Sequence, residues 1–173
     1  AQIGLFPNED GVDTFHVVAK AHFNMGNPLS LCDDQPQPLM ADIYYGEPGL
    51  SSLKYPGDFH PGKAATDVFM LGHACSPEKQ PVYYLDTSLT LGPLRKTIRV
   101  WGPRTWQGGA LSQPQPFTHL PVIYEHAYGG QHIQDGQVLG GEERNPIGRG
   151  FLGHQERSLF DGAAAPQLDD PFN

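Results

Sequence analysis

The residues of this chain that could do chemistry begin with eight histidines. Zinc sites use three or four ligands, often in short local pairs such as HxxxH, HExxH or CxxC. None of these spacings occurs among the histidines, which are His16, His22, His60, His73, His119, His126, His132 and His154. His16 and His22 could share a strand face, but they are too far apart to chelate one ion. We therefore predict scattered surface and network histidines and no metal.

A second candidate is an acid–base site that combines Glu125 and His126 with Asp67 and Arg104. A carboxylate and an imidazole could move protons if they met in one pocket. Neighbours on one strand point to opposite faces, so Glu125 and His126 do not form a dyad by themselves. No GxSxG motif marks a nucleophile, and no cue near Cys75 indicates a stabilised thiolate. The alternative function is an enzyme that acts on a carbohydrate or small ligand. It requires four side chains to converge at one cleft, those of Asp67, Arg104, Glu125 and His126.

A third candidate is the stretch Trp101-Gly102-Pro103-Arg104-Thr105-Trp106. Trp and Arg are enriched at binding hot spots, so it could form a partner-binding patch. Alternatively, Trp101 or Trp106 fills the core while Arg104 stacks on an aromatic ring or pairs with a carboxylate. Asp67 and Glu125 are candidate partners for Arg104, because an unpaired charge in an apolar strand is costly. We favour the structural role.

The glycine pairs of the chain do not form phosphate-binding loops. Gly129-Gly130 and Gly148-Arg149-Gly150 follow neither the GxxxxGK[ST] nor the GxGxxG pattern at a strand-to-helix junction. We expect these glycines to permit turns with positive φ angles, and we expect no cofactor.

Short strands would have to position these residues. With 21 glycines and 17 prolines, turn signals are frequent. No segment keeps helical periodicity over three turns, and the one short helix considered lies at residues 156–160. This pattern predicts a mainly β fold, an antiparallel β-sandwich or a partly open barrel with long loops and little helix. The strand candidates are residues 14–25, 39–45, 65–74 and 120–128, with a hairpin of residues 82–90 and 94–100 around Leu91-Gly92-Pro93.

The length of 173 residues fits one ordinary domain. We predict a single β-rich domain over residues 1–160. Residues 131–150 are polar and glycine-rich and are expected to form a long surface loop. Residues 161–173 have little to bury and are expected to form a loosely ordered C-terminal tail that trails or wraps over the domain.

The net charge is −8, from 11 basic and 19 acidic residues. An acidic surface repels phosphate groups, so nucleic acid and anionic membranes are disfavoured as partners. Cys32 and Cys75 make no disulfide framework, which indicates a reducing compartment. No apolar run approaches the roughly 18 residues of a membrane helix, and no signal peptide is evident. We therefore expect a cytoplasmic location.

Several short motifs follow one another in a fixed order along the chain. They are Lys63-x-x-Thr66-Asp67, Gly72-His73-Ala74, Gly102-x-Arg104-x-Trp106, Pro116-Phe117, Tyr124-Glu125-His126-Ala127-Tyr128-Gly129-Gly130 and Asn145-Pro146-Ile147-Gly148-Arg149-Gly150-Phe151. From about Phe15 to Phe151, this order resembles a bacterial domain-of-unknown-function family (number twenty-one sixty-nine) linked to type VI secretion. The chain departs from the family pattern at Pro103, where an acidic residue is expected, and at His126, where arginine is expected.

The resemblance implies a cytoplasmic adaptor or chaperone. Such a protein binds a toxic effector at its tip-like or PAAR-type region and helps to load it onto the secretion spike, without a cofactor or a reaction. The residues implied to organise the fold or a partner-binding surface are Asp67, Arg104, Trp106, Glu125, Tyr128, Asn145, Arg149 and Phe151. A third hypothesis is a structural subunit or fusion module that binds through the glycine-rich segment 131–141.

Overall fold

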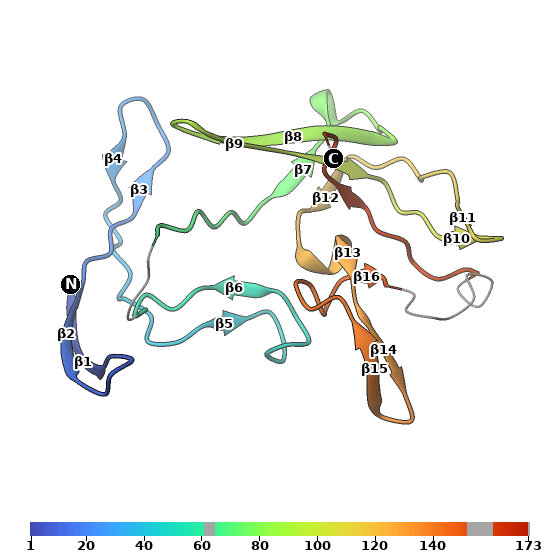
Figure 1. Cartoon of the computed structure of the whole chain (residues 1–173). Helices are drawn as coiled ribbons and strands as arrows, with labels where there is room; N and C mark the ends of the chain where they lie inside the picture. Colours follow the sequence, from blue (N-terminus) through green and yellow to red (C-terminus); the bar gives the residue numbers. More distant parts are fainter. Residues whose placement is uncertain (61–64, 152–160, 173) are drawn as a thin grey trace. The chain divides into compact units, whose positions relative to one another are not determined.

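Short β-strands make up most of the regular secondary structure in the computed structural model of this chain (Figure 1). The structure describes residues 1–60, 65–151 and 161–172. Within these ranges, the helical segments are two short 3-10 turns, η1 (Pro77–Lys79) and η2 (Tyr124–His126). The predicted mainly β fold is confirmed, and the described strands form small ladders without a closed barrel. The helix considered at residues 156–160 lies outside the described residues.

The chain divides into two compact units. The first unit consists of Ala1–Tyr45 and Leu53–Phe69, and the second of Gly46–Ser52 and Met70–Asn173. One β-rich domain over residues 1–160 stays a prediction, because a grouping of contacts does not show which parts fold independently.

The first unit starts with a hairpin of β1 (Gln2–Pro7) and β2 (Asp13–Val18). The Asn8 side chain closes its turn, because Oδ1 accepts the backbone N–H groups of Asp10 and Val12 at 3.0 and 2.8 Å. An Asx turn of this kind is a local signal that the sequence carries by itself. The strand expected over residues 14–25 is interrupted after β2.

Two short ladders complete the first unit. They are β3 (Phe23–Asn24) with β4 (Ser30–Leu31), and β5 (Ile43–Tyr44) with β6 (Leu53–Tyr55). The Asp58 carboxylate ties distant segments of this unit together, since it accepts the Leu39 N–H and pairs with Lys20 Nζ, both at 2.7 Å. Burial alone would raise the pKa of Asp58, but these two partners hold it below its ordinary value.

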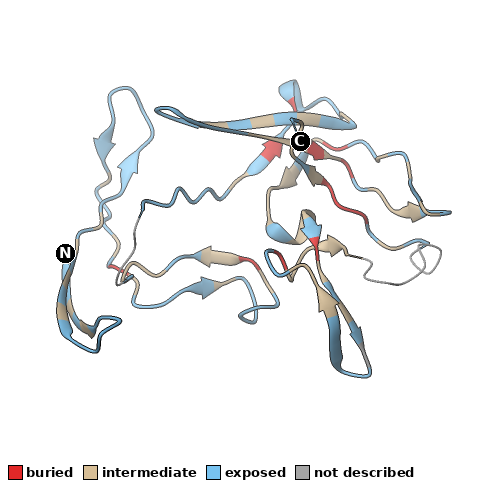
Figure 2. Ribbon diagram, viewed as in Figure 1, coloured by how far each residue is buried: buried red, intermediate tan, exposed pale blue. Residues whose placement is uncertain are grey.

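The second unit has a three-stranded sheet in the order β17-β9-β8, from β8 (Tyr84–Leu91), β9 (Leu94–Trp101) and β17 (Leu168–Asp169). The predicted hairpin around residues 91–93 is confirmed by the β8–β9 register. Ala74, Val100 and Phe117 form the buried apolar core. Figure 2 colours the buried residues red and shows some of them on β7 and on the C-terminal segment.

Residues 161–172 differ from the loosely ordered tail expected from the sequence. Leu168 pairs with Val100 in the sheet, and Ala165 and Gln167 are buried. The segment has few apolar side chains, but its backbone forms β17, which pairs with the edge of β9 that β8 leaves open. Main-chain hydrogen bonds therefore order a stretch whose side chains alone give little reason for burial.

The remaining strands of the second unit form two-stranded ladders. They are β7 (His73–Cys75) with β12 (His119–Pro121), β10 (Trp106–Gln107) with β11 (Ala110–Leu111), β14 (Gln131–Gln134) with β15 (Gln137–Gly141), and β13 (Tyr128–Gly129) with β16 (Arg149–Gly150). The first three ladders are antiparallel, and β13 and β16 are parallel.

Three sequence predictions that fall wholly or partly in the second unit are wrong. Of the strand expected at residues 65–74, only the end lies in a strand, β7. The strand expected at residues 120–128 is divided into β12, η2 and β13. The loop expected at residues 131–150 contains the β14–β15 hairpin, whose turn residues Asp135 and Gly136 have φ angles of +51° and +79°. These φ values suit the tight turns that join antiparallel strands.

Two further features bear on the setting of the protein. Cys32 and Cys75 are free thiols. Among the helices of the described residues, none is long and apolar enough to cross a membrane.

Candidate functional site

The site is built where two motif segments of the second unit meet, residues 124–130 and 145–151. Strands β13 and β16 run parallel, with Tyr128 opposite Arg149 and Gly129 opposite Gly150. The Asn145 side chain is 8% exposed, and Nδ2 donates to the backbone carbonyls of Tyr124 and Tyr128 at 2.8 and 3.0 Å. One amide thus fixes the 3-10 turn and the strand that follows it.

The glycines of these motifs are required by close backbone contact. A Cβ atom on Gly129, whose φ is +151°, would lie 2.1 Å from the Asn145 carbonyl oxygen. A Cβ atom on Gly148 would lie 2.4 Å from Asn145 Nδ2. The expectation of positive φ angles is confirmed at Gly129, Gly130 and Gly150. The backbones of the two segments therefore approach each other more closely than a side chain at Gly129 or Gly148 would allow. We call this arrangement the interlocked site.

The Glu125 carboxylate accepts two hydrogen bonds from one buried serine, Ser52. The donors are the Ser52 backbone N–H, at 2.8 Å, and the Ser52 hydroxyl. Burial alone would raise the pKa of Glu125, but the two hydrogen bonds from Ser52 hold it below the ordinary value. The carboxylate is thus ionised at neutral pH and engaged by Ser52.

His126 follows Glu125 on the 3-10 turn η2, and not on a strand as the sequence predicts. Its Nδ1 lies 3.1 Å from the Pro121 carbonyl oxygen. Burial and the nearby Arg149 lower the pKa of His126, so the imidazole is neutral at pH 7. A neutral histidine tethered to the backbone is suited to holding the turn.

Arg149 is half-buried and bonds to neutral groups. Nε donates to the Glu125 backbone carbonyl at 2.6 Å, and Nη1 donates to Gln167 Oε1 at 3.4 Å. Burial lowers the pKa of Arg149, against the attraction of Glu125. In the described part of the chain, no carboxylate lies within ion-pair distance of this guanidinium.

Arg104 stacks on an aromatic ring and pairs with a carboxylate, as the structural interpretation of its motif predicts, but the carboxylate is a different one. Its guanidinium lies 4.9 Å from the centre of the Trp101 ring, and Nη2 pairs with Asp169 Oδ2 at 3.2 Å. Nε donates to the Pro166 carbonyl at 2.6 Å. The expected partner Glu125 is engaged by Ser52 instead.

Buried Gln167, in the C-terminal segment, makes hydrogen bonds both to the surroundings of Arg149 and to Trp101, on which Arg104 stacks. Its backbone N–H donates to the His126 carbonyl at 2.8 Å, and its carbonyl accepts the Trp101 N–H at 2.8 Å. Sequence reasoning missed Ser52, Gln167 and Asp169, because their partners lie far away along the chain and no local pattern marks them.

Four other residues predicted for the site lie at its margin or outside it. Tyr128 is exposed on β13, and the Phe151 N–H donates to the Gly129 carbonyl at 2.9 Å. Trp106 begins β10 and is half-buried. Asp67 is exposed and belongs to the first unit. The structure thus groups Arg104, Glu125, Tyr128, Asn145, Arg149 and Phe151 in the second unit.

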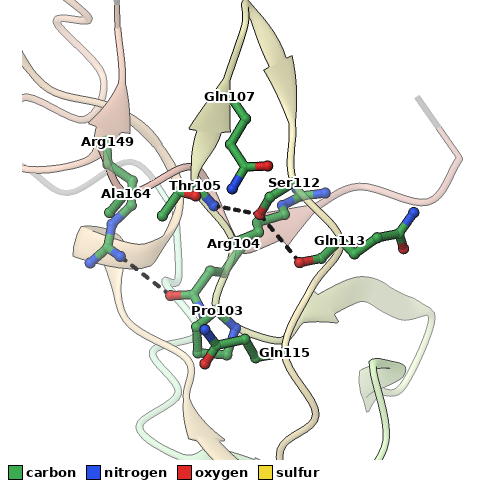
Figure 3. Close-up of a pocket in the computed structure, with 10 residues that line it drawn as sticks. Pro103, Arg104, Thr105, Gln107, Ser112, Gln113, Gln115, Arg149 and Ala164 are labelled. Atoms are coloured by element: carbon green, nitrogen blue, oxygen red, sulfur yellow. Dashed lines mark hydrogen bonds between the residues drawn. The ribbon is translucent and has the colours of Figure 1, made fainter. Parts of the chain in front are cut away.

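A pocket of about 420 Å³ lies beside this site (Figure 3). Residues of β10 and next to β10 and β11 form part of its wall, with the Thr105 N–H donating to Ser112 Oγ at 3.0 Å. Among the described residues, the charged members of the lining are two arginines, and neither Glu125 nor His126 belongs to it. The residues that line it are Pro103, Arg104, Thr105, Gln107, Ser112, Gln113, Gln115, Arg149, Ala164 and Gln167.

An apolar surface occurs in the first unit, on the β1–β2 hairpin. Ile3 lies opposite Val17 and Leu5 lies opposite Phe15, so the four side chains share one face. They are between 54% and 78% exposed, whereas Phe6 on the other face packs against Phe59. We call this set of four residues the hairpin face. Within the described residues, β1 and β2 pair only with each other, so each has a free edge.

No group of three or more His, Cys, Asp or Glu residues that could hold a metal occurs in the described ranges. The family model described as "Uncharacterized protein conserved in bacteria (DUF2169)" matches residues 10–173. No curated protein and no solved structure matches the chain. The match covers both interlocked motif segments and the Arg104 segment.

Proposed function

The chain belongs to the bacterial family DUF2169, and from this premise we propose that it is a cytoplasmic adaptor or chaperone of type VI secretion. It binds an effector at its tip-like or PAAR-type region and helps to load it onto the secretion spike. This family is the one that the ordered motifs of the sequence resemble. The role in secretion is part of our proposal and comes from what that resemblance implies.

The hairpin face is the observation that supports this role best. A two-stranded hairpin that leaves Leu5 and Phe15 in water has apolar area available for a partner. Fully burying one such side chain contributes about 1.5–3 kcal/mol. Four of them would contribute about 6–12 kcal/mol, which is comparable with the roughly 4–15 kcal/mol that association costs and leaves little surplus for affinity. We therefore expect a free edge of β1 or β2 to add main-chain hydrogen bonds to the effector.

The interlocked site supplies rigidity to such an adaptor. Glu125 is engaged by Ser52, and Arg104 by Asp169 and Trp101. Contacts of this kind support a rigid scaffold, which suits an adaptor that binds its partner stoichiometrically. An enzyme built on Asp67, Arg104, Glu125 and His126 stays an alternative hypothesis that none of the contacts described above favours.

The test is co-expression with the effector encoded next to the gene of this protein. The variant Leu5→Thr with Phe15→Thr removes half of the hairpin face while keeping residues that favour strands. We expect the co-purified effector to fall at least about tenfold, since two buried apolar contacts are lost. If the effector is equally soluble and equally secreted without this protein, the adaptor role is wrong.

The matched control changes an equivalent pair on the β14–β15 hairpin. Ile133 and Val138 face each other across the strands and are 56% and 58% exposed. Ile133→Thr with Val138→Thr should leave effector binding unchanged. If only this pair loses the effector, the binding surface is segment 131–141, as the third sequence hypothesis holds, and the hairpin face is not used.

A further inference from the structure

The pocket beside the interlocked site has a charge opposite to that of the chain. The net charge of the protein is −8, yet the charged residues in the described pocket lining are Arg104 and Arg149. Its volume of about 420 Å³ is in the range of pockets that hold small ligands or short segments. A hollow whose described lining has two guanidinium groups and no carboxylate is suited to an anionic group.

Arg149 has donors to offer that group. A guanidinium carries five N–H donors in a fixed plane. In the described part of the chain, Arg149 uses Nε for the Glu125 carbonyl and Nη1 for Gln167. Both acceptors are neutral, so the positive charge is not balanced by an ion pair there. Bidentate contact with a carboxylate would supply two acceptors and a negative charge in direct contact with the guanidinium.

Arg104 adds positive charge, but it is less available for direct contact. Its Nε and Nη2 atoms hold Pro166 and Asp169. This ion pair balances much of the Arg104 charge, and Asp169 is not among the described residues that line the pocket. A carboxylate in the pocket would therefore lie closest to Arg149, with Arg104 contributing weaker, long-range attraction.

Amide side chains make up much of the remaining lining. Each amide offers both donors and acceptors, which is the pattern needed to bind a peptide backbone. A phosphate dianion would meet stronger repulsion from an acidic protein than a singly charged carboxylate does. The glutamines concerned are Gln107, Gln113, Gln115 and Gln167.

We propose that the pocket binds a carboxylate of the partner polypeptide, through Arg149 with support from Arg104 and the surrounding glutamines. This inference rests on the proposed function, because it takes the partner to be a protein. The carboxylate belongs either to an acidic side chain or to a chain terminus, and the probes below distinguish these two sources.

The experiment is an NMR titration of the isotope-labelled full chain, observing the arginine Nε–H and glutamine amide resonances. The probes are acetyl-Gln-Glu-Gln-amide, acetyl-Gln-Gln-Gln with a free terminal carboxylate, the neutral acetyl-Gln-Gln-Gln-amide, and inorganic phosphate. We expect saturable shifts of the Arg149 resonance with one or both acidic peptides. Binding of the first alone assigns the side-chain source, and binding of the second alone assigns the terminal source.

Variants test whether the binding occurs in this pocket. Arg149→Gln should weaken it at least about tenfold, as expected for hydrogen bonds to a charged group. Because Arg149 also holds the Glu125 carbonyl, we add changes at exposed Gln113, whose side chain has no hydrogen bond within the described residues. Gln113→Glu should weaken binding about two- to fivefold, and Gln113→Lys should strengthen it to a similar extent.

Arg144→Gln is the matched control. Its side chain is 89% exposed, pairs with Glu142 and lies outside the pocket lining. It removes the same charge as Arg149→Gln and should leave binding unchanged. Equal weakening by Arg144→Gln, equal binding of the neutral peptide, or binding of phosphate but neither acidic peptide would overturn the proposal. Co-purification of the effector is measured separately, so failure of the pocket and failure of the adaptor role give different results.

Discussion

Replacing Asn145 by alanine removes both side-chain hydrogen bonds that interlock the two motif segments. The donors to Tyr124 and Tyr128 disappear, at a residue that is only 8% exposed. Each bond contributes about 0.5–1.5 kcal/mol, and the Tyr124 carbonyl keeps the Ala127 N–H as a partner. We expect the free energy of unfolding of the second unit to fall by about 1–3 kcal/mol. The melting temperature should fall by about 2–12 °C for a chain of this size.

Urea denaturation followed by tryptophan fluorescence measures this change, because Trp101 and Trp106 both lie in the second unit. Asn24→Ala, at an exposed position of the first unit, is the control and should leave the midpoint unchanged. Asn145→Asp keeps the shape but turns a carboxylate oxygen toward two carbonyl oxygens, so it should destabilise at least as much. An Asn145→Asp protein that unfolds at the wild-type urea concentration would refute the hydrogen bonding described for Asn145.

Ser52→Ala removes the hydroxyl donor to the Glu125 carboxylate and should cost about 1.5–3 kcal/mol at pH 7. Because the folded pKa of Glu125 lies below its ordinary value of 4.5, this stabilisation is present above that value and is lost as the pH falls through the folded pKa. The difference in urea midpoint between wild type and variant should therefore shrink at acidic pH, and equal differences at pH 7 and about pH 3 would contradict this account. Arg104→Lys keeps the charge but loses the planar fork that serves Asp169 and stacks on Trp101, so it should destabilise by about 1–2 kcal/mol. Wild-type stability of this variant, measured by the same urea titration, would show that charge alone suffices.

Local signals in the sequence predict the hairpins of this fold to different degrees. The β8–β9 hairpin is predicted because its arms are rich in residues that favour strands and flank Leu91-Gly92-Pro93. The β14–β15 hairpin was expected to be a loop because glycine and glutamine dominate it. Its signal was Asp135-Gly136, a pair that favours the two-residue turn observed between the strands. Turn chemistry was thus a better guide here than polarity.

The candidate site could be predicted only in part. The sequence indicates that Arg104, Glu125 and Asn145 matter, because each lies in a motif of aromatic, charged and glycine residues. It gives no information on Ser52 or Gln167, which carry the partner atoms. Those contacts depend on how distant segments pack, and periodicity or turn signals do not encode that packing.

The contacts that complete the second unit join residues far apart in the chain. Ser52 and Glu125 are separated by 73 positions, and Arg104 and Asp169 by 65. Closing such long loops costs entropy before any contact forms, so chains of this kind fold over milliseconds to seconds rather than microseconds. Until residues 161–169 have left the ribosome, the nascent chain keeps unpaired strand edges in water, where they can aggregate. Expression at low temperature, which weakens hydrophobic association between such exposed chains, should therefore raise the yield of native protein.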